Sequence, residues 1–60
     1  MKTEKNFQKE QGYTEEMMDE LRCCYNSDYN EHKDLSYIDW LYYLKENEPI
    51  ILCELLEDFM

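Results

Sequence analysis

Fifteen Asp or Glu residues against six Lys or Arg give this 60-residue chain a formal net charge of -9, and self-repulsion at that density opposes compaction. The length allows no more than one domain, and a hydrophobic content of 43% is too high for a disordered acidic tail. Nucleic acid and anionic membrane surfaces repel a negative chain, so direct binding to either is disfavoured.

The small size also limits stability and suggests a compartment. A domain of this length buries only about 60% of its unfolded surface, and a homodimer or another partner is a common source of further stability. No apolar leader is visible near the first residue, and the longest apolar run, residues 50–53, is far too short to cross a bilayer. We therefore expect a cytoplasmic protein, with homodimer formation left open.

Residues 1–11 differ from the rest of the chain because they are rich in Lys and contain a single bulky apolar residue beyond the initial Met, Phe7. Thr3 is a suitable N-cap and Gly12 a suitable C-terminal stop, which favours a short helix. A flexible arm is the alternative, because chain termini are often mobile. We accordingly divide the chain into an N-terminal arm or short helix (1–11) and an acidic helical domain (12–60).

The first long helix is expected over residues 14–26, with Thr14 as its N-cap. Its apolar side chains form a stripe of roughly 120°, made of Met17, Met18, Leu21, Cys24 and Tyr25. Carboxylates occupy the opposite side, and we name them the first acidic group: Glu15, Glu16, Asp19 and Glu20. Two of them lie in the first turn, where the helix dipole favours anions.

A second helix is expected over residues 36–46, after a polar, turn-rich loop at 27–35. Ser36 and Asp39 form a variant of the capping box, and apolar side chains then run nearly all round the helix, which is typical of a central helix. Trp40 and Tyr43 lie three residues apart on one side, and both residue types are favoured anchors at interfaces. Packing in the core is the competing interpretation for both.

A third helix is expected over residues 49–59, because Pro49 suits the first helical position. Its apolar residues, Ile51, Leu52, Leu55, Leu56 and Phe59 among them, fall on one side at helical spacing. The carboxylates fall on the other side, and we name them the second acidic group: Glu54, Glu57 and Asp58. The sequence thus predicts an all-α fold, a compact three-helix domain with or without a short N-terminal helix.

Both acidic groups have a spacing that suits recognition of a basic surface. Carboxylates at helical i,i+3 and i,i+4 positions lie about 5–6 Å apart at their Cβ atoms, which is comparable with the pitch of DNA phosphates. A surface made only for solubility normally interleaves Lys with Glu, but Arg22 is the only basic residue in the first long helix and the third has none. Solubility remains the competing explanation.

The sequence gives little support for a metal site or a catalytic site. Three cysteines and His32 are present, but the spacing of Cys23, Cys24 and Cys53 matches no zinc pattern. No nucleophile or phosphate-binding motif appears. We expect no metal, no cofactor and no enzymatic activity, with Cys24 and Cys53 in the core and Cys23 as an exposed thiol.

These features favour a small inhibitor that presents a DNA-like anionic surface to a basic, nucleic-acid-binding protein. It resembles phage-encoded DNA mimics in charge, size and composition rather than in motif. The absence of Ala and Val and the many Tyr, Lys, Asn, Glu and Ile residues also favour an AT-rich source, such as a phage or another mobile element. Two alternatives stay open: an adaptor that docks through the aromatic face of the second helix, and an antitoxin-like partner of a basic protein.

Overall fold

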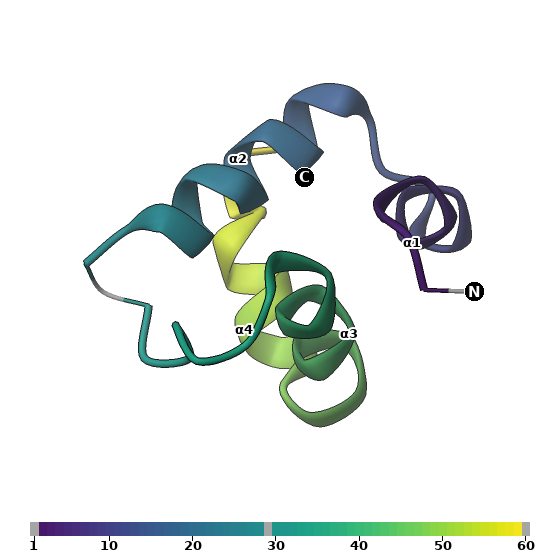
Figure 1. The fold of residues 1–60 in the computed structure, drawn as a ribbon. Coiled ribbons are helices and arrows are strands. Elements are labelled where there is room, and N and C mark those ends of the chain that lie inside the picture. The colour runs from purple at the N-terminus through teal and green to yellow at the C-terminus, as the bar shows by residue number, and fades with distance from the viewer. Residues whose placement is uncertain (1, 29, 60) are drawn as a thin grey trace.

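The computed structural model describes residues 2–28 and 30–59. These residues form four α-helices and a final 3-10 turn (Figure 1): α1 (Glu4–Gln11), α2 (Glu15–Asn26), α3 (Tyr37–Asn47), α4 (Pro49–Leu55) and η1 (Glu57–Phe59). No strand occurs in this part of the chain. The all-α prediction is confirmed. The short N-terminal helix that the sequence left open is present as α1, in addition to the three expected helices.

Local capping chemistry explains where the first three helices begin. The hydroxyl oxygens of Thr3, Thr14 and Ser36 each accept a hydrogen bond from the backbone N–H three residues later, at 3.1, 3.3 and 3.2 Å. Such bonds satisfy backbone donors that have no partner inside the helix. Gly12 ends α1 in the left-handed region, with φ of 72°, a conformation that glycine adopts without steric cost.

The third predicted helix is shorter than the sequence indicated. Pro49 occupies its first turn, but α4 ends at Leu55, and residues 57–59 form the 3-10 turn η1. Negative charge is unfavourable at a helix C-terminus, and tighter 3-10 geometry is common at helix ends. Glu54 and Asp58 therefore do not share one continuous α-helical face, which corrects the predicted boundary at residue 59.

α3 is the central element, as its nearly continuous apolar surface predicted. It contacts α1, α2 and α4, and α2 also contacts α4. In Figure 1, α3 and α4 lie side by side, and α1 lies at the edge of the bundle.

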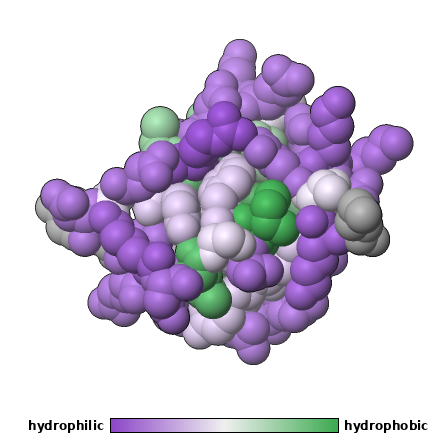
Figure 2. Space-filling model, viewed as in Figure 1, coloured by the Kyte–Doolittle hydropathy of each residue, from purple (hydrophilic) through white to green (hydrophobic). Residues whose placement is uncertain are grey.

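The core is built mainly from α2, α3 and α4. Its buried hydrophobic side chains among the described residues are Phe7, Met17, Met18, Leu21, Trp40, Leu41, Tyr42, Leu44, Leu52 and Leu56. No polar or charged residue is buried in the same part of the chain. Polar residues cover most of the face in Figure 2, and hydrophobic residues appear there only in small patches.

α1 belongs to this core and is not a separate arm. Phe7 is fully buried, and its ring lies edge-on to Tyr13 and Tyr42, with centroids 5.9 and 5.4 Å apart. Two ion pairs add links from α1 to α2 and α3: Arg22 to Glu4 at 2.6 Å and Lys45 to Glu10 at 3.0 Å. The open choice between helix and arm is thus resolved as a helix for residues 4–11.

Three apolar residues of the C-terminal segment lie at the surface. Ile50 is 75% exposed, Ile51 40% and Phe59 39%, although the helical pattern placed Ile51 and Phe59 on the buried side. The inward positions of the short α4 are taken by Leu52 and Leu56. Because the α-helix stops at Leu55, the 3-10 turn directs Phe59 away from the predicted stripe.

Candidate protein-binding surface

The first acidic group lies on the outer side of α2, as predicted. Glu15, Glu16 and Asp19 are exposed and Glu20 is half-buried. Glu20 accepts a weak hydrogen bond from the Cys24 thiol, with Oε1 and Sγ 3.9 Å apart. Within residues 2–28 and 30–59, no cation forms an ion pair with any member of this group.

The second acidic group lies on the last turn of α4 and on η1. Glu54, Glu57 and Asp58 are all exposed, and none of them forms a hydrogen bond through its side chain or an ion pair with another described residue. Phe59, which is exposed, follows Asp58 in the chain, and the exposed Ile50 lies one helical turn before Glu54 on α4. This end of the molecule combines uncompensated negative charge with accessible hydrophobic surface.

Three of the basic side chains are paired with carboxylates outside the two acidic groups. Ion pairs formed by Arg and Lys in the described residues join Arg22 to Glu4, Lys45 to Glu10 and Lys33 to Asp28. The hydrogen bond and the charge of Glu4 raise the pKa of the Arg22 guanidinium, so Arg22 is committed to α1. The carboxylates of both acidic groups therefore remain without an intramolecular counter-ion in this part of the chain.

The two acidic groups differ in their surroundings. Arg22 and Lys5 line the same shallow hollow as Glu15 and Asp19, so positive charge borders the first group. No Lys or Arg occurs after Lys45 in the sequence, and the pairs that Lys45 makes are with Glu10 and the ring of Tyr42. The second acidic group is consequently the stronger candidate for attracting a basic partner.

The two predicted aromatic anchors, Trp40 and Tyr43, differ in how far they are buried. Trp40 is only 4% exposed, because its indole packs against the rings of Tyr25 and Tyr37, with centroids 5.5 and 6.3 Å away. The core interpretation therefore holds for Trp40, and only the part that borders a cavity is available to a partner. Tyr43 is half-buried, with its ring 4.7 Å from that of His32, and it remains a candidate contact.

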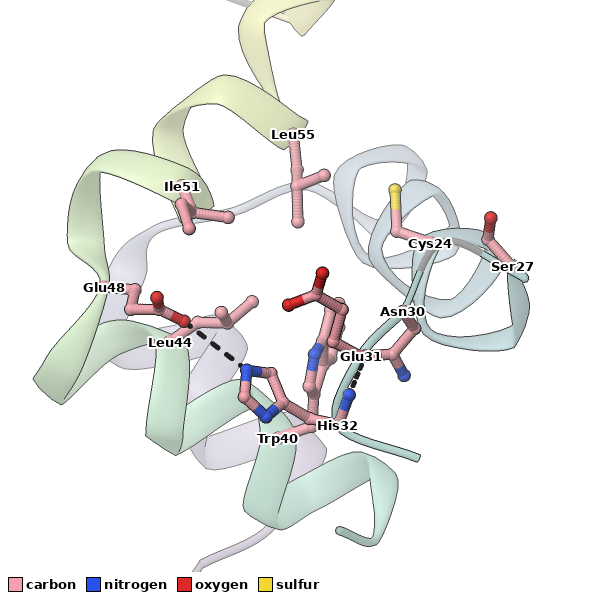
Figure 3. A pocket seen from close by; sticks show the side chains of 10 residues that line it. All are labelled: Cys24, Ser27, Asn30, Glu31, His32, Trp40, Leu44, Glu48, Ile51 and Leu55. Atoms are coloured by element: carbon pink, nitrogen blue, oxygen red, sulfur yellow. Dashed lines mark hydrogen bonds and ion pairs between the residues drawn. The ribbon is translucent and has the colours of Figure 1, made fainter. Parts of the chain in front are cut away.

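The sequence did not indicate a cavity of about 450 Å³ between α2, α3, α4 and the loop that joins α2 to α3 (Figure 3). Its apolar walls include Trp40, Leu44, Ile51 and Leu55. Polar side chains also line it, among them Glu31 and His32 from the loop and Glu48 from the junction of α3 and α4. These residues come from distant parts of the chain, so no local pattern could reveal the site.

Hydrogen bonds between side chains and the backbone hold the loop beside this cavity. The Asn30 amide donates to the Tyr25 carbonyl at 2.9 Å, and its side-chain oxygen accepts from the His32 N–H at 2.9 Å. The Tyr25 hydroxyl donates to the Leu35 carbonyl. These bonds hold the backbone on both sides of Glu31, whose exposed side chain lines the cavity.

The structure confirms the predicted exposure of the Cys23 thiol and corrects the predicted burial of the Cys53 thiol. Both are exposed, whereas Cys24 is half-buried. The expectation that Cys53 lies in the core was wrong, because the inward side of α4 is filled by Leu52 and Leu56. Burial, together with the negative charges of Glu20 and the neighbouring Cys23, raises the pKa of the Cys24 thiol above its ordinary value.

We predict that iodoacetamide at neutral pH modifies Cys23 and Cys53 several times faster than Cys24. The thiolate is the reactive form, and a raised pKa together with partial burial leaves less of it accessible at Cys24. Tandem mass spectrometry of timed digests measures the three rates, and the same reaction in denaturant is the control, in which the difference should largely disappear. Faster modification of Cys24 in the folded protein would contradict the packing described for α2.

Metal-ligating residues do not gather in the described part of the chain, where no group of three or more His, Cys, Asp or Glu side chains could hold an ion. Among the helices of that same part, none has the length and apolar character needed to cross a membrane. The sequence matches no known protein family, no curated protein and no solved structure.

Proposed function

We propose that this protein is a small acidic inhibitor that binds the nucleic-acid-binding surface of a basic protein and competes there with DNA. The observation that carries the proposal is the clustering of carboxylates in the two acidic groups, none of which forms an ion pair within the described residues. A surface made only for solubility normally interleaves Lys with Glu, whereas α4 and η1 contain three carboxylates and no Lys or Arg.

The energetic basis is electrostatic complementarity. The target's Lys and Arg side chains are already arranged to neutralise phosphates, and complementary fields speed encounter and favour the correct partner. Capped helices hold the carboxylates of α2 on a fixed scaffold, so little conformational freedom is lost on binding there. Phe59, which is exposed next to Asp58, and Ile50, which is exposed one turn before Glu54, can add apolar contacts that DNA cannot offer.

The proposal includes a cytoplasmic site of action and a phage or mobile-element origin, which the composition favours. An antitoxin-like partner of a basic protein would use the same electrostatics and differs only in its target. The adaptor alternative rests on the aromatic side of α3, and the burial of Trp40 leaves the half-buried Tyr43 as the accessible member of the two predicted anchors. The anionic surface is therefore the better supported basis for binding.

Affinity capture tests the proposal. The immobilised protein is exposed to a lysate of a low-GC bacterium, and the bound proteins are eluted in parallel with duplex DNA and with raised salt. The proposal predicts that one or a few DNA-binding proteins are released by both treatments, because DNA competes for their surface and salt screens the attraction. Bound proteins that resist both treatments and depend on Tyr43 instead would favour the adaptor.

A further inference from the structure

We propose that the cavity between α2, α3, α4 and the α2–α3 loop binds an arginine side chain of the basic protein partner. This inference rests on the proposed function, because it takes the partner to be basic, and it adds a specific contact away from the two acidic groups. Three features of the protein support an arginine here: the apolar walls of the cavity, two carboxylates that line it and the net negative charge of the chain.

The walls suit a hydrocarbon stem. Leu44, Ile51 and Leu55 line the cavity together with the accessible part of Trp40, and its volume is about 450 Å³. That volume falls within the range of roughly 300–1,000 Å³ found for ligand pockets. Arginine buries its methylene groups along apolar surface while its charged end reaches a polar one, and this cavity offers both kinds of surface.

Two carboxylates favour a cation. Figure 3 shows the Glu31 side chain extending into the cavity, with its carboxylate between the walls, and it has no hydrogen bond or ion pair with another described residue. Glu48 lies at another side of the cavity, with its Oε2 atom 3.7 Å from His32 Nε2. Glu31 is exposed and Glu48 half-buried, so solvent screens part of their charge, but both carboxylates favour a cation and repel phosphates and carboxylates.

The aromatic lining favours a guanidinium over an ammonium group. A guanidinium is planar and weakly hydrated, it stacks on aromatic faces, and it binds carboxylates with two parallel hydrogen bonds. Trp40 and His32 both border the cavity beside Glu31. An ammonium group is compact and strongly hydrated, so it would lose more hydration on entering and use the rings less well.

The test is an NMR titration of the full chain with N-acetyl-arginine N-methylamide. We expect saturable shifts at the Trp40 indole N–H and at the methyl groups of Leu44 and Leu55. The matched control ligand is the citrulline analogue, which has nearly the same shape but no charge, and we expect it to bind at least about tenfold more weakly. Equal binding of the two ligands, or shifts spread over α2 and η1 without the cavity residues, would overturn the proposal.

Two single variants test whether the Glu31 carboxylate is the charge that binds arginine. Glu31→Gln should weaken arginine binding about tenfold, because it removes the carboxylate inside the cavity and keeps its shape. Asp34→Asn makes the same charge change at an exposed position of the same loop, outside the cavity lining, and should leave binding within about twofold of the parent. A similar loss in both variants would show a general effect of net charge and would refute the site.

The outcomes for the cavity and for the proposed function are separable. Arginine binding that fails in a protein that still competes with DNA would remove the cavity site alone. Arginine binding that persists in a protein that does not compete with DNA would keep the cavity site and remove the DNA-competing role.

Discussion

Replacing Phe7 by Ala should remove a large share of the free energy of unfolding at room temperature. Truncating a buried Phe costs about 3–5 kcal/mol, and a 60-residue domain has only roughly 3–9 kcal/mol of total stability at typical values per residue. Phe7 is fully buried, and its loss would also remove the edge-on contacts with Tyr13 and Tyr42. Urea unfolding followed by far-UV circular dichroism measures the effect.

Two control variants show whether the loss of stability comes from the buried ring of Phe7. Lys5→Ala changes an exposed residue of α1 and should shift the unfolding free energy by no more than about 0.5 kcal/mol. Phe7→Leu keeps part of the buried volume and should give a stability between those of the parent and Phe7→Ala. A Phe7→Ala protein as stable as the parent would show that α1 is not part of the cooperative core.

Neutralising the second acidic group should weaken binding to the DNA-binding partner found by affinity capture. The triple change Glu54→Gln, Glu57→Gln and Asp58→Asn removes three exposed charges and keeps the side-chain shapes. We expect a dissociation constant about 3-fold to 100-fold higher, the range for a few exposed ion pairs. The salt dependence of binding should also become less steep, because fewer charges take part. Calorimetric titration at several salt concentrations measures both quantities.

A second triple variant controls for net charge. Asp34→Asn, Asp39→Asn and Glu46→Gln change the total charge by the same amount at exposed positions that belong to neither acidic group. Its binding should stay within about threefold of the parent, because screening limits the reach of distant charges. Equal losses in the two triple variants would show that total charge, and not the second acidic group, controls binding.

The local chemistry of the sequence predicted most of the fold. Thr14, Ser36 and Pro49 mark helix starts through capping and ring geometry that need only neighbouring residues. The end of α4 was not predictable in the same way, because the apolar spacing continues to Phe59 while the backbone turns at Leu56. Tertiary packing and the unfavourable charges near the helix end decide that boundary.

The candidate site was only partly predictable. The acidic groups follow from helical spacing, and their exposure agrees with it. The burial of Trp40 depends on rings contributed by Tyr25 and Tyr37, one of them from another helix, which spacing along α3 does not reveal. The cavity brings Glu31 near Ile51 and Leu55, and only the assembled fold makes that contact.

The most direct test of the central claim is a competition measurement with the captured DNA-binding protein. A fluorescent duplex is bound to that protein, and increasing amounts of the acidic protein are added at fixed salt. The account predicts complete displacement of the duplex, with an apparent DNA affinity that falls in proportion to the concentration of competitor, and a much weaker effect of the Glu54→Gln, Glu57→Gln, Asp58→Asn variant. A ternary complex in which DNA and the acidic protein are bound together would contradict it.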